Sequence, residues 1–368
     1  MPTGPSAPRS RIFGLDLMRA VAIVLVVASH ADDLLVPFWT ADTGVADLDG
    51  VDLFFVLSGF LIGGILLRTL EATEIPWQKR LLDFWQRRWL RTLPNYFLFL
   101  AINIVLVHEG WMPGLLNVNA LAYFVFLQNF IIPLELFYWE SWSLAVEEWF
   151  YLLFPLAVFL FIGALRRHVK GVFLWVTLIM IAIPTLLRFP AMDAVATPAQ
   201  LDLLVRKIVV LRLDTIGFGV LAAWAFHYFP AIWRSRRAEL LLIGLFGYTT
   251  ATLLRGPDSL MYMGTWYFTF SAISMALWLP ALASWERVGR WGAPIAFISR
   301  ISYALYLVHL PVRYLLDWFV VRTSKEAAML QYVAYWAICI VLAMGVYLLF
   351  ERRFMGMRKG LSRRILAT

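Results

Sequence analysis

Ten apolar stretches recur along the 368-residue chain, each between 15 and 23 residues long. A helix needs about 20 mainly apolar residues to cross the hydrocarbon core of a bilayer, so stretches near this length are candidate membrane spans. The pattern predicts an all-α, polytopic membrane helical bundle with about ten transmembrane helices. The stretches lie at 15–31, 53–67, 93–107, 143–165, 171–187, 213–229, 240–254, 265–283, 294–312 and 329–350.

The composition indicates that lipid, rather than water, surrounds much of this chain. Hydrophobic residues make up 61% of the chain and charged residues 15%, whereas soluble domains contain about 45–50% and about 25%. A disordered scaffold is therefore excluded. The net charge of +8 is spread over short clusters between the apolar stretches, so we expect no nucleic-acid partner.

The basic clusters also predict the orientation of the bundle. With the N-terminus inside, the segments on that side hold 22 Lys and Arg and the opposite loops hold 8, and residues 32–52 contain six Asp but no Lys or Arg. The positive-inside rule then places both termini in the cytoplasm. We expect a single membrane domain over residues 1–368, with a basic cytoplasmic tail at 351–368 and no fused soluble domain.

Two further segments are expected not to span the membrane. Residues 115–138 are apolar but are interrupted by polar residues and proline, which indicates a re-entrant or interfacial segment. The segment 76–94 combines basic residues with an apolar stripe every four residues, which predicts an amphipathic helix lying in the headgroup plane. The stripe consists of Trp77, Leu81, Trp85 and Trp89.

Ionisable residues inside a span are costly in lipid and are therefore candidate functional residues. Arg19 and His30 share the first span and stand eleven positions apart, about 20° from full register and about 16 Å along the helix axis. They therefore face the same side of that helix. The alternative is an arginine that reaches the interface and a histidine satisfied within the bundle.

The fourth span begins with a second polar group, since Ser143 and Glu147 lie one turn apart near its outer end. We expect Glu147 to reach His30 and to orient the imidazole, as the carboxylate does in a catalytic triad. A capping arrangement at the start of the helix is the alternative.

Arg88 and Arg91 lie three residues apart and therefore on one helix face. Two guanidiniums in this arrangement suit a phosphate, although lipid headgroups would serve equally as the anion. Arg212 and Asp214 open the sixth span, and His309 lies near the end of the ninth, where a solvated or interfacial role is the alternative.

Small residues and cysteine carry less information. Ser58, Gly59, Gly63 and Gly64 give the second span a face suited to close helix packing. Cys339 is the only cysteine, which excludes an intrachain disulfide. No phosphate-loop, dinucleotide or zinc-peptidase motif is present, and we expect no metal.

Several motifs occur in the order found in one family: Arg19 followed by His30, VDLFFVLSGFLIGG at 51–64, the Arg88 and Arg91 pair before TLPNYF, SWSLAVEEWFY at 141–151, RLDTIGFG at 212–219, ISYALYLVHLP at 301–311, and FERR at 350–353. Over residues 12–360 the chain resembles the acyltransferase-3 family of bacterial integral membrane acyltransferases.

The resemblance implies an enzyme of the bacterial inner (plasma) membrane that transfers an acyl group, often acetyl, from acyl-CoA to a hydroxyl of a sugar or glycolipid. It implies that His30 is the catalytic residue with Arg19 as its partner, and that Arg88 and Arg91 hold the phosphates of coenzyme A. Ser143 and Glu147 are placed at the site. We add Asp52, Arg212, Asp214 and His309 to Ser143 as candidates for substrate binding.

Residues and resemblance together give a mechanism in which His30 is the general base for the acceptor hydroxyl. An acyl-histidine relay is the second form of this mechanism. The main alternative function is a secondary transporter that uses His30 and Glu147 as a proton relay. Such transporters usually show repeated halves, and this chain shows none by eye.

Overall fold

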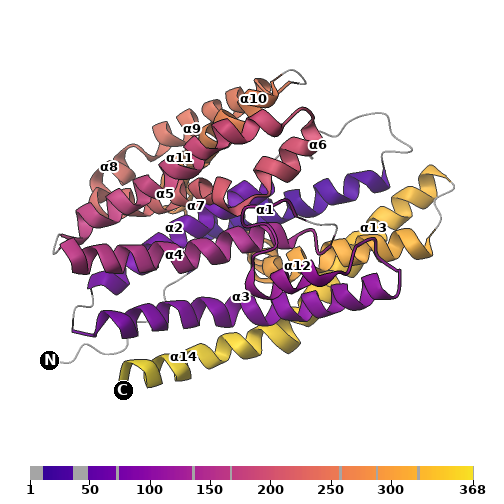
Figure 1. Cartoon of the computed structure of the whole chain (residues 1–368), viewed down its shortest axis with the longest axis horizontal. Helices are drawn as coiled ribbons and strands as arrows, with labels where there is room; N and C mark the ends of the chain where they lie inside the picture. Colours follow the sequence, from indigo (N-terminus) through magenta and orange to yellow (C-terminus); the bar gives the residue numbers. More distant parts are fainter. Residues whose placement is uncertain are drawn as a thin grey trace.

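The computed structural model describes residues 11–35, 49–71, 74–134, 137–165, 168–256, 259–286, 289–320 and 324–367. Within these ranges the secondary structure is helical and no strand is present. Figure 1 shows the long helices running roughly side by side as one bundle. The predicted all-α class is confirmed.

Each of the ten predicted apolar stretches lies within, or largely within, a long helix. The helices are α1 (Phe13–Ala31), α2 (Gly50–Glu71), α3 (Trp77–His108), α4 (Ser141–Leu165), α5 (Val169–Ala191), α7 (Leu213–Tyr228), α9 (Arg237–Leu253), α11 (Phe268–Leu282), α12 (Gly292–Phe319) and α13 (Lys325–Val346). The chain ends with α14 (Arg352–Ala367), and α6 (Pro198–Leu201), α8 (Pro230–Ser235) and α10 (Leu260–Tyr262) are short.

Among the described residues, seven helical segments are long and apolar enough to cross a membrane. They contain α1, α2, α3, α4, α5, α12 and α13, which is the architecture of a multi-pass membrane protein. At 16, 17 and 15 residues, α7, α9 and α11 are shorter than a typical span of about 20 residues. The count of ten spans and the cytoplasmic position of both termini stay predictions.

The helix α3 differs from its prediction. We expected a separate helix over 76–94 in the headgroup plane, but α3 runs unbroken through Pro94 for 32 residues, about 48 Å. Neighbouring helices hold the turn just before the proline, since Thr92 donates to Glu148 at 2.6 Å and Tyr303 donates to the Thr92 carbonyl at 2.8 Å. The first half of α3 packs along α14 (Figure 1), so protein covers part of the surface that we had assigned to headgroups.

The helices α2 and α7 pack closely enough to require glycine. A Cβ at Gly59 would lie 2.0 Å from the Ile216 carbonyl oxygen, and a Cβ at Gly219 would lie 2.0 Å from the Val56 carbonyl oxygen. The predicted packing face of the second span is therefore confirmed. This contact fixes α2, which carries Ser58 beside Gly59, relative to the rest of the bundle.

The segment between α3 and α4 does not span the bundle, as predicted. Its one regular element is a 3-10 helix, Val118–Val125. The amide of Asn129 donates to the carbonyls of Lys207 at 2.6 Å and Trp142 at 3.1 Å, which ties this segment to the start of α4. Such irregular backbone is stable because protein groups satisfy it. The predicted polar break at Glu135 lies outside the described residues.

Candidate active site

An open cavity lies among α1, α2, α3, α4 and α12. It brings together five of the ten candidate residues from the sequence: Arg19, Arg88, Arg91, Ser143 and Glu147. The other polar side chains that line it are Ser58, Thr92, Ser302, Tyr303 and Tyr306. Residues from five helices therefore converge on one space.

One end of this cavity is strongly basic. Arg19 donates to Ser299 at 3.4 Å and lies 3.7 Å from Asp16. The guanidinium of Arg88 stacks 4.2 Å above the ring of Tyr151, and its buried Nε has no hydrogen-bond partner. In the described part of the chain, neither Arg88 nor Arg91 forms an ion pair. Guanidiniums without carboxylate partners, facing a cavity, are suited to bind an anion.

Glu147 lies deeper in the cavity, and its partner differs from the one we expected. Ser58 of α2 donates to Glu147 Oε1 at 2.8 Å. The expected contact between Glu147 and His30 is therefore wrong. Helix periodicity placed the two residues at a similar depth, but it could not show which neighbouring helix each side chain faces.

Ser143 and Tyr306 mark the far end of the cavity. Their hydroxyl oxygens are 2.6 Å apart, and Tyr306 also donates to the Glu140 carbonyl at 2.9 Å. Ser299 of α12 contacts Arg19, and Tyr306 lies two turns further along the same helix. The cavity therefore runs from the arginines towards Tyr306.

His30 is paired with His309, and the hydrogen bonds fix both tautomers. A carbonyl oxygen only accepts, so His309 Nδ1 must donate to the Tyr306 carbonyl, at 2.6 Å, and His30 Nδ1 must donate to the Val26 carbonyl, at 2.9 Å. His309 Nε2, which lies 3.1 Å from His30 Nδ1, then accepts from the same proton. The Nε2 atom of His30 is left with a free lone pair.

The histidine pair stands just beyond the cavity. Ser302 and Tyr306 line the cavity from α12, and His309 follows Tyr306 on the same helix, about 4.5 Å further along the axis. His30 does not line the cavity, but it is exposed, whereas His309 is fully buried. His30 is thus the accessible member of the pair.

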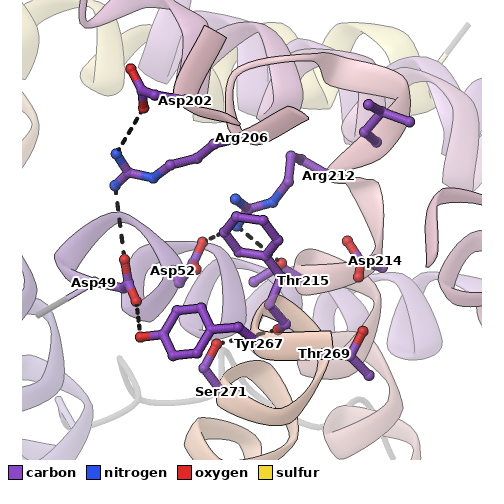
Figure 2. Close-up of polar contacts among 12 residues, drawn as sticks. Asp49, Asp52, Asp202, Arg206, Arg212, Asp214, Thr215, Tyr267, Thr269 and Ser271 are labelled. Carbon is purple, nitrogen blue, oxygen red and sulfur yellow. Dashed lines mark hydrogen bonds and ion pairs between the residues drawn. The ribbon is translucent and has the colours of Figure 1, made fainter. Parts of the chain in front are cut away.

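Three candidate substrate-binding residues lie elsewhere, in a buried ionic network that Figure 2 shows. Arg212 pairs with Asp52 (Figure 2). Asp214 pairs with Arg188 at 2.7 Å. The exposed fractions of these four side chains are between 0 and 3%. In this structure these side chains pair with one another inside the bundle, away from the cavity, and the assignment of Asp52, Arg212 and Asp214 to substrate binding stays a prediction.

Arg188 was missed by the sequence analysis. It also donates to Thr269 of α11 at 2.7 Å, so it connects α5 to both α7 and α11. The sequence did show a basic residue directly after the apolar stretch 171–187, but we had assigned that residue to a loop. A fully buried arginine needs such partners.

A second part of the network was also missed. Arg206 lies 3.2 Å from Asp202 and 3.9 Å from Asp49, and Tyr267 donates to Asp49 (Figure 2). The Arg206 guanidinium also lies 5.6 Å from the centre of the Trp142 ring. The contacts of Asp49 with Arg206 and Tyr267 join residues far apart in the chain, so they give no local signal in the sequence.

Glu140 is an unpaired buried acid in the turn before α4. Neither of its carboxyl oxygens has a hydrogen-bond partner. Burial raises the pKa of Glu140 to about 8, because the charged form loses its hydration. The carboxyl group is therefore mostly neutral at pH 7.

Within the described residues, no group of three or more His, Cys, Asp or Glu side chains is arranged to hold a metal ion. The cavity presents arginines, hydroxyl groups and a carboxylate, with two histidines beside it.

Comparison with known proteins agrees with the resemblance inferred from the motifs. The model of a family described as an acyltransferase domain matches residues 12–352. The O-acetyltransferase OatA of Staphylococcus aureus is 26% identical over 327 residues, which cover 81% of this chain and 50% of that protein. The peptidoglycan O-acetyltransferase OatA of Listeria monocytogenes is 26% identical over 332 residues, covering 83% of this chain and 50% of that protein. The chain thus matches about half the length of these relatives.

Proposed function

Because the chain belongs to the acyltransferase-3 family, whose domain model covers residues 12–352, we propose that it is a membrane O-acyltransferase. The observation that carries this proposal is a cavity with Arg88 and Arg91 at one end and a histidine pair beyond the other. In that pair His309 lies one helical turn past Tyr306, and the exposed His30 can act as the base. Family membership favours this function over the secondary transporter.

The donor is an acyl-CoA thioester, and acetyl-CoA is the first choice because the relatives are named O-acetyltransferases. Arg88 and Arg91, with Arg19 beside them, bind the diphosphate at the cytoplasmic face. The pantetheine arm lies along the cavity, past Ser58 and Glu147. The thioester then reaches Ser143 and Tyr306.

His30 acts as the general base. Its free Nε2 accepts the proton of the acceptor hydroxyl while the hydroxyl oxygen attacks the thioester carbon. The tetrahedral intermediate collapses with cleavage of the C–S bond, and the proton on His30 passes to the coenzyme A thiolate. The hydroxyl of Ser143 or of Tyr306 stabilises the oxyanion, because both stand at the end of the cavity.

His309 is a positioning residue in this mechanism, the role that we had first given to Glu147. Together with the Val26 carbonyl it accepts from Nδ1 of His30. This arrangement keeps the proton on Nδ1 and the lone pair on Nε2. When His30 becomes an imidazolium, the same two acceptors stabilise it.

The acceptor is a hydroxyl group of a carbohydrate, either a glycan or a sugar-bearing lipid. The Listeria relative is named a peptidoglycan O-acetyltransferase, so peptidoglycan fragments are the first acceptors to test. The acceptor approaches the exposed side of His30, opposite the end at which the donor enters.

The direct test is release of free coenzyme A from acetyl-CoA by purified protein in detergent, with peptidoglycan fragments or a glycolipid extract as acceptor. We expect acceptor-dependent release by the wild type and none by His30→Ala. Failure of the wild type to bind or turn over acetyl-CoA, with folding confirmed by its melting curve, would overturn the donor assignment. Acylated His30 trapped in a single turnover would establish the relay in place of direct transfer.

A further inference from the structure

We propose that α14 completes a second phosphate site, in which Arg358 faces Arg88 and Arg91 of α3 and binds the 3′-phosphate of coenzyme A. This proposal rests on the proposed donor. It gives the basic tail, which the sequence analysis treated only as a determinant of orientation, a direct part in recognising the donor.

The register between α3 and α14 places Arg358 opposite these arginines. Close to the start of α14, Asn95 donates to Glu351 at 3.1 Å. Near its end, Ser362 donates to Asp83 and accepts from Arg87 at 2.7 Å. The two helices are therefore antiparallel, as Figure 1 shows for the yellow α14 along α3.

Residues 351, 358 and 362 are separated by seven and four positions, so they share one face of the helix. The contacts at 351 and 362 both point to α3, and Arg358 lies between them. On α3, the positions between Asn95 and Asp83 on the matching face include Arg91 and Arg88. The geometry therefore sets three arginines against one another across a helix–helix contact.

The protein balances the charges in this contact only in part, through Glu351, which lies close enough to act on both Arg91 and Arg358. Arg358 is close enough to Arg87, Arg88 and Arg91 for their charges to act on it. Arg87 is paired with Asp83 at 2.8 Å, and Glu351 is bonded to Asn95. Through the ranges that the structure describes, Arg88, Arg91 and Arg358 form no ion pair. Like charges held together in this way are stabilised when an anion binds between them.

The chemistry of the arginine side chain specifies the anion. A guanidinium presents planar paired donors that fit two oxygens of a phosphate, and several guanidiniums together suit a dianion. In the proposed donor, the group that carries two negative charges on one phosphorus is a phosphate monoester.

The cavity indicates which phosphate of the donor binds here. Arg19, Arg88 and Arg91 line the cavity that holds the pantetheine arm, so they contact the diphosphate joined directly to that arm. Arg358 does not line the cavity. It therefore contacts a phosphate on the far side of the diphosphate, which in coenzyme A is the 3′-phosphate of the ribose.

The test compares the binding of coenzyme A and 3′-dephospho-coenzyme A to the full chain in nanodiscs. The variant is Arg358→Gln, and the matched control is Arg353→Gln, an exposed arginine of the same helix. We expect the wild type and the control to prefer coenzyme A by about tenfold, in keeping with one charged hydrogen-bonded contact. Arg358→Gln should lose that preference without losing affinity for the dephospho form.

Equal affinity of the wild type for both ligands would overturn the second site and leave the donor assignment intact. Binding of neither ligand by folded wild-type protein would overturn both. Nanodiscs with and without phosphatidylglycerol distinguish the two molecules that could supply the phosphate, coenzyme A and an anionic lipid headgroup. If the anionic lipid raises the melting temperature through Arg358 and coenzyme A cannot displace it, the site binds lipid and the proposal is wrong.

Discussion

His30 of α1 and His309 of α12 share a hydrogen bond of 3.1 Å between Nδ1 and Nε2, although 279 positions separate them in the chain. Their ring centres are 5.0 Å apart. The bond has a defined direction, since His309 Nδ1 is committed to the Tyr306 carbonyl. A neutral imidazole thus occupies the place that a carboxylate holds in a catalytic triad.

Replacing either histidine should separate their two roles. His30→Ala removes the base and should lower kcat by about 10²–10⁴-fold. His309→Phe leaves the base but removes one acceptor of its Nδ1 proton, so we expect a smaller fall in kcat, a shifted pH–rate profile and an unchanged KM for acetyl-CoA. Steady-state release of coenzyme A measures all three quantities.

The exposed His168 provides the control for these variants. His168→Gln should leave kcat and the pH–rate profile as in the wild type. A His309→Phe enzyme with wild-type kcat and pH–rate profile would contradict the positioning role.

Arg88→Gln and Arg91→Gln should each raise the KM for acetyl-CoA by about 10–100-fold, the effect of losing a charged hydrogen-bonded contact of about 1.5–3 kcal/mol. The value of kcat at saturation should change little, because these side chains lie far from the thioester. Initial rates over a range of acetyl-CoA concentrations test this, with Arg300→Gln, an exposed arginine outside the cavity, as the control. An unchanged KM in both variants would remove the arginines from donor binding.

Arg188→Met should destabilise the fold by about 3–5 kcal/mol, because it leaves the carboxylate of Asp214 buried without its cation. The combined Arg188→Met and Asp214→Leu variant should recover much of that loss, since no charge is then left unpaired. Unfolding in detergent, followed by tryptophan fluorescence, gives the free energy of unfolding. A double variant that is as unstable as the sum of both single variants would argue against the pair as a unit.

Glu140 should make the stability depend on pH. Its pKa is about 8 in the folded state, against an ordinary value of 4.5 for a solvated glutamate, so between these pH values the folded protein binds more protons than the unfolded chain. The stability contributed by the neutral carboxyl group is complete below pH 4.5 and is lost as pH rises through 8, by about 1.4 kcal/mol per pH unit.

Glu140→Gln, which stays neutral, should remove this dependence and raise the melting temperature at pH 8. Melting curves between pH 5 and 9 measure the effect. Glu109→Gln, at an exposed position, should retain the wild-type slope. If Glu140→Gln and the wild type show the same slope, the Glu140 carboxyl is not the group that titrates.

The sequence predicted the parts of the fold that depend on local hydrophobicity. Long apolar stretches became helices, and the small-residue face at Gly59 became a close contact with α7. Five candidate residues, including Arg19 and Glu147, line one cavity. Each of these outcomes follows from the periodicity of a single helix together with the order of the motifs.

The partners of those residues could not be predicted in the same way. Which face of α12 meets α1 depends on the packing of the whole bundle, so the sequence indicated Glu147 as the partner of His30 where the structure has His309. The same limit explains why Arg188 was overlooked. The unbroken course of α3 through Pro94 is supported by contacts of Thr92 with Glu148 and Tyr303, which are 56 and 211 positions away and leave no mark on the local pattern.

The cavity ends at Ser143 and Tyr306, one helical turn before His309, the partner of His30. In an enzyme of the proposed type, coenzyme A can remain in one aqueous compartment and the acceptor in the other. The layer of protein that separates them is then only a few ångströms thick. Only a two-carbon fragment has to pass it. The cell would thereby modify a surface polymer with cytoplasmic metabolic energy, without exporting the nucleotide that carries it.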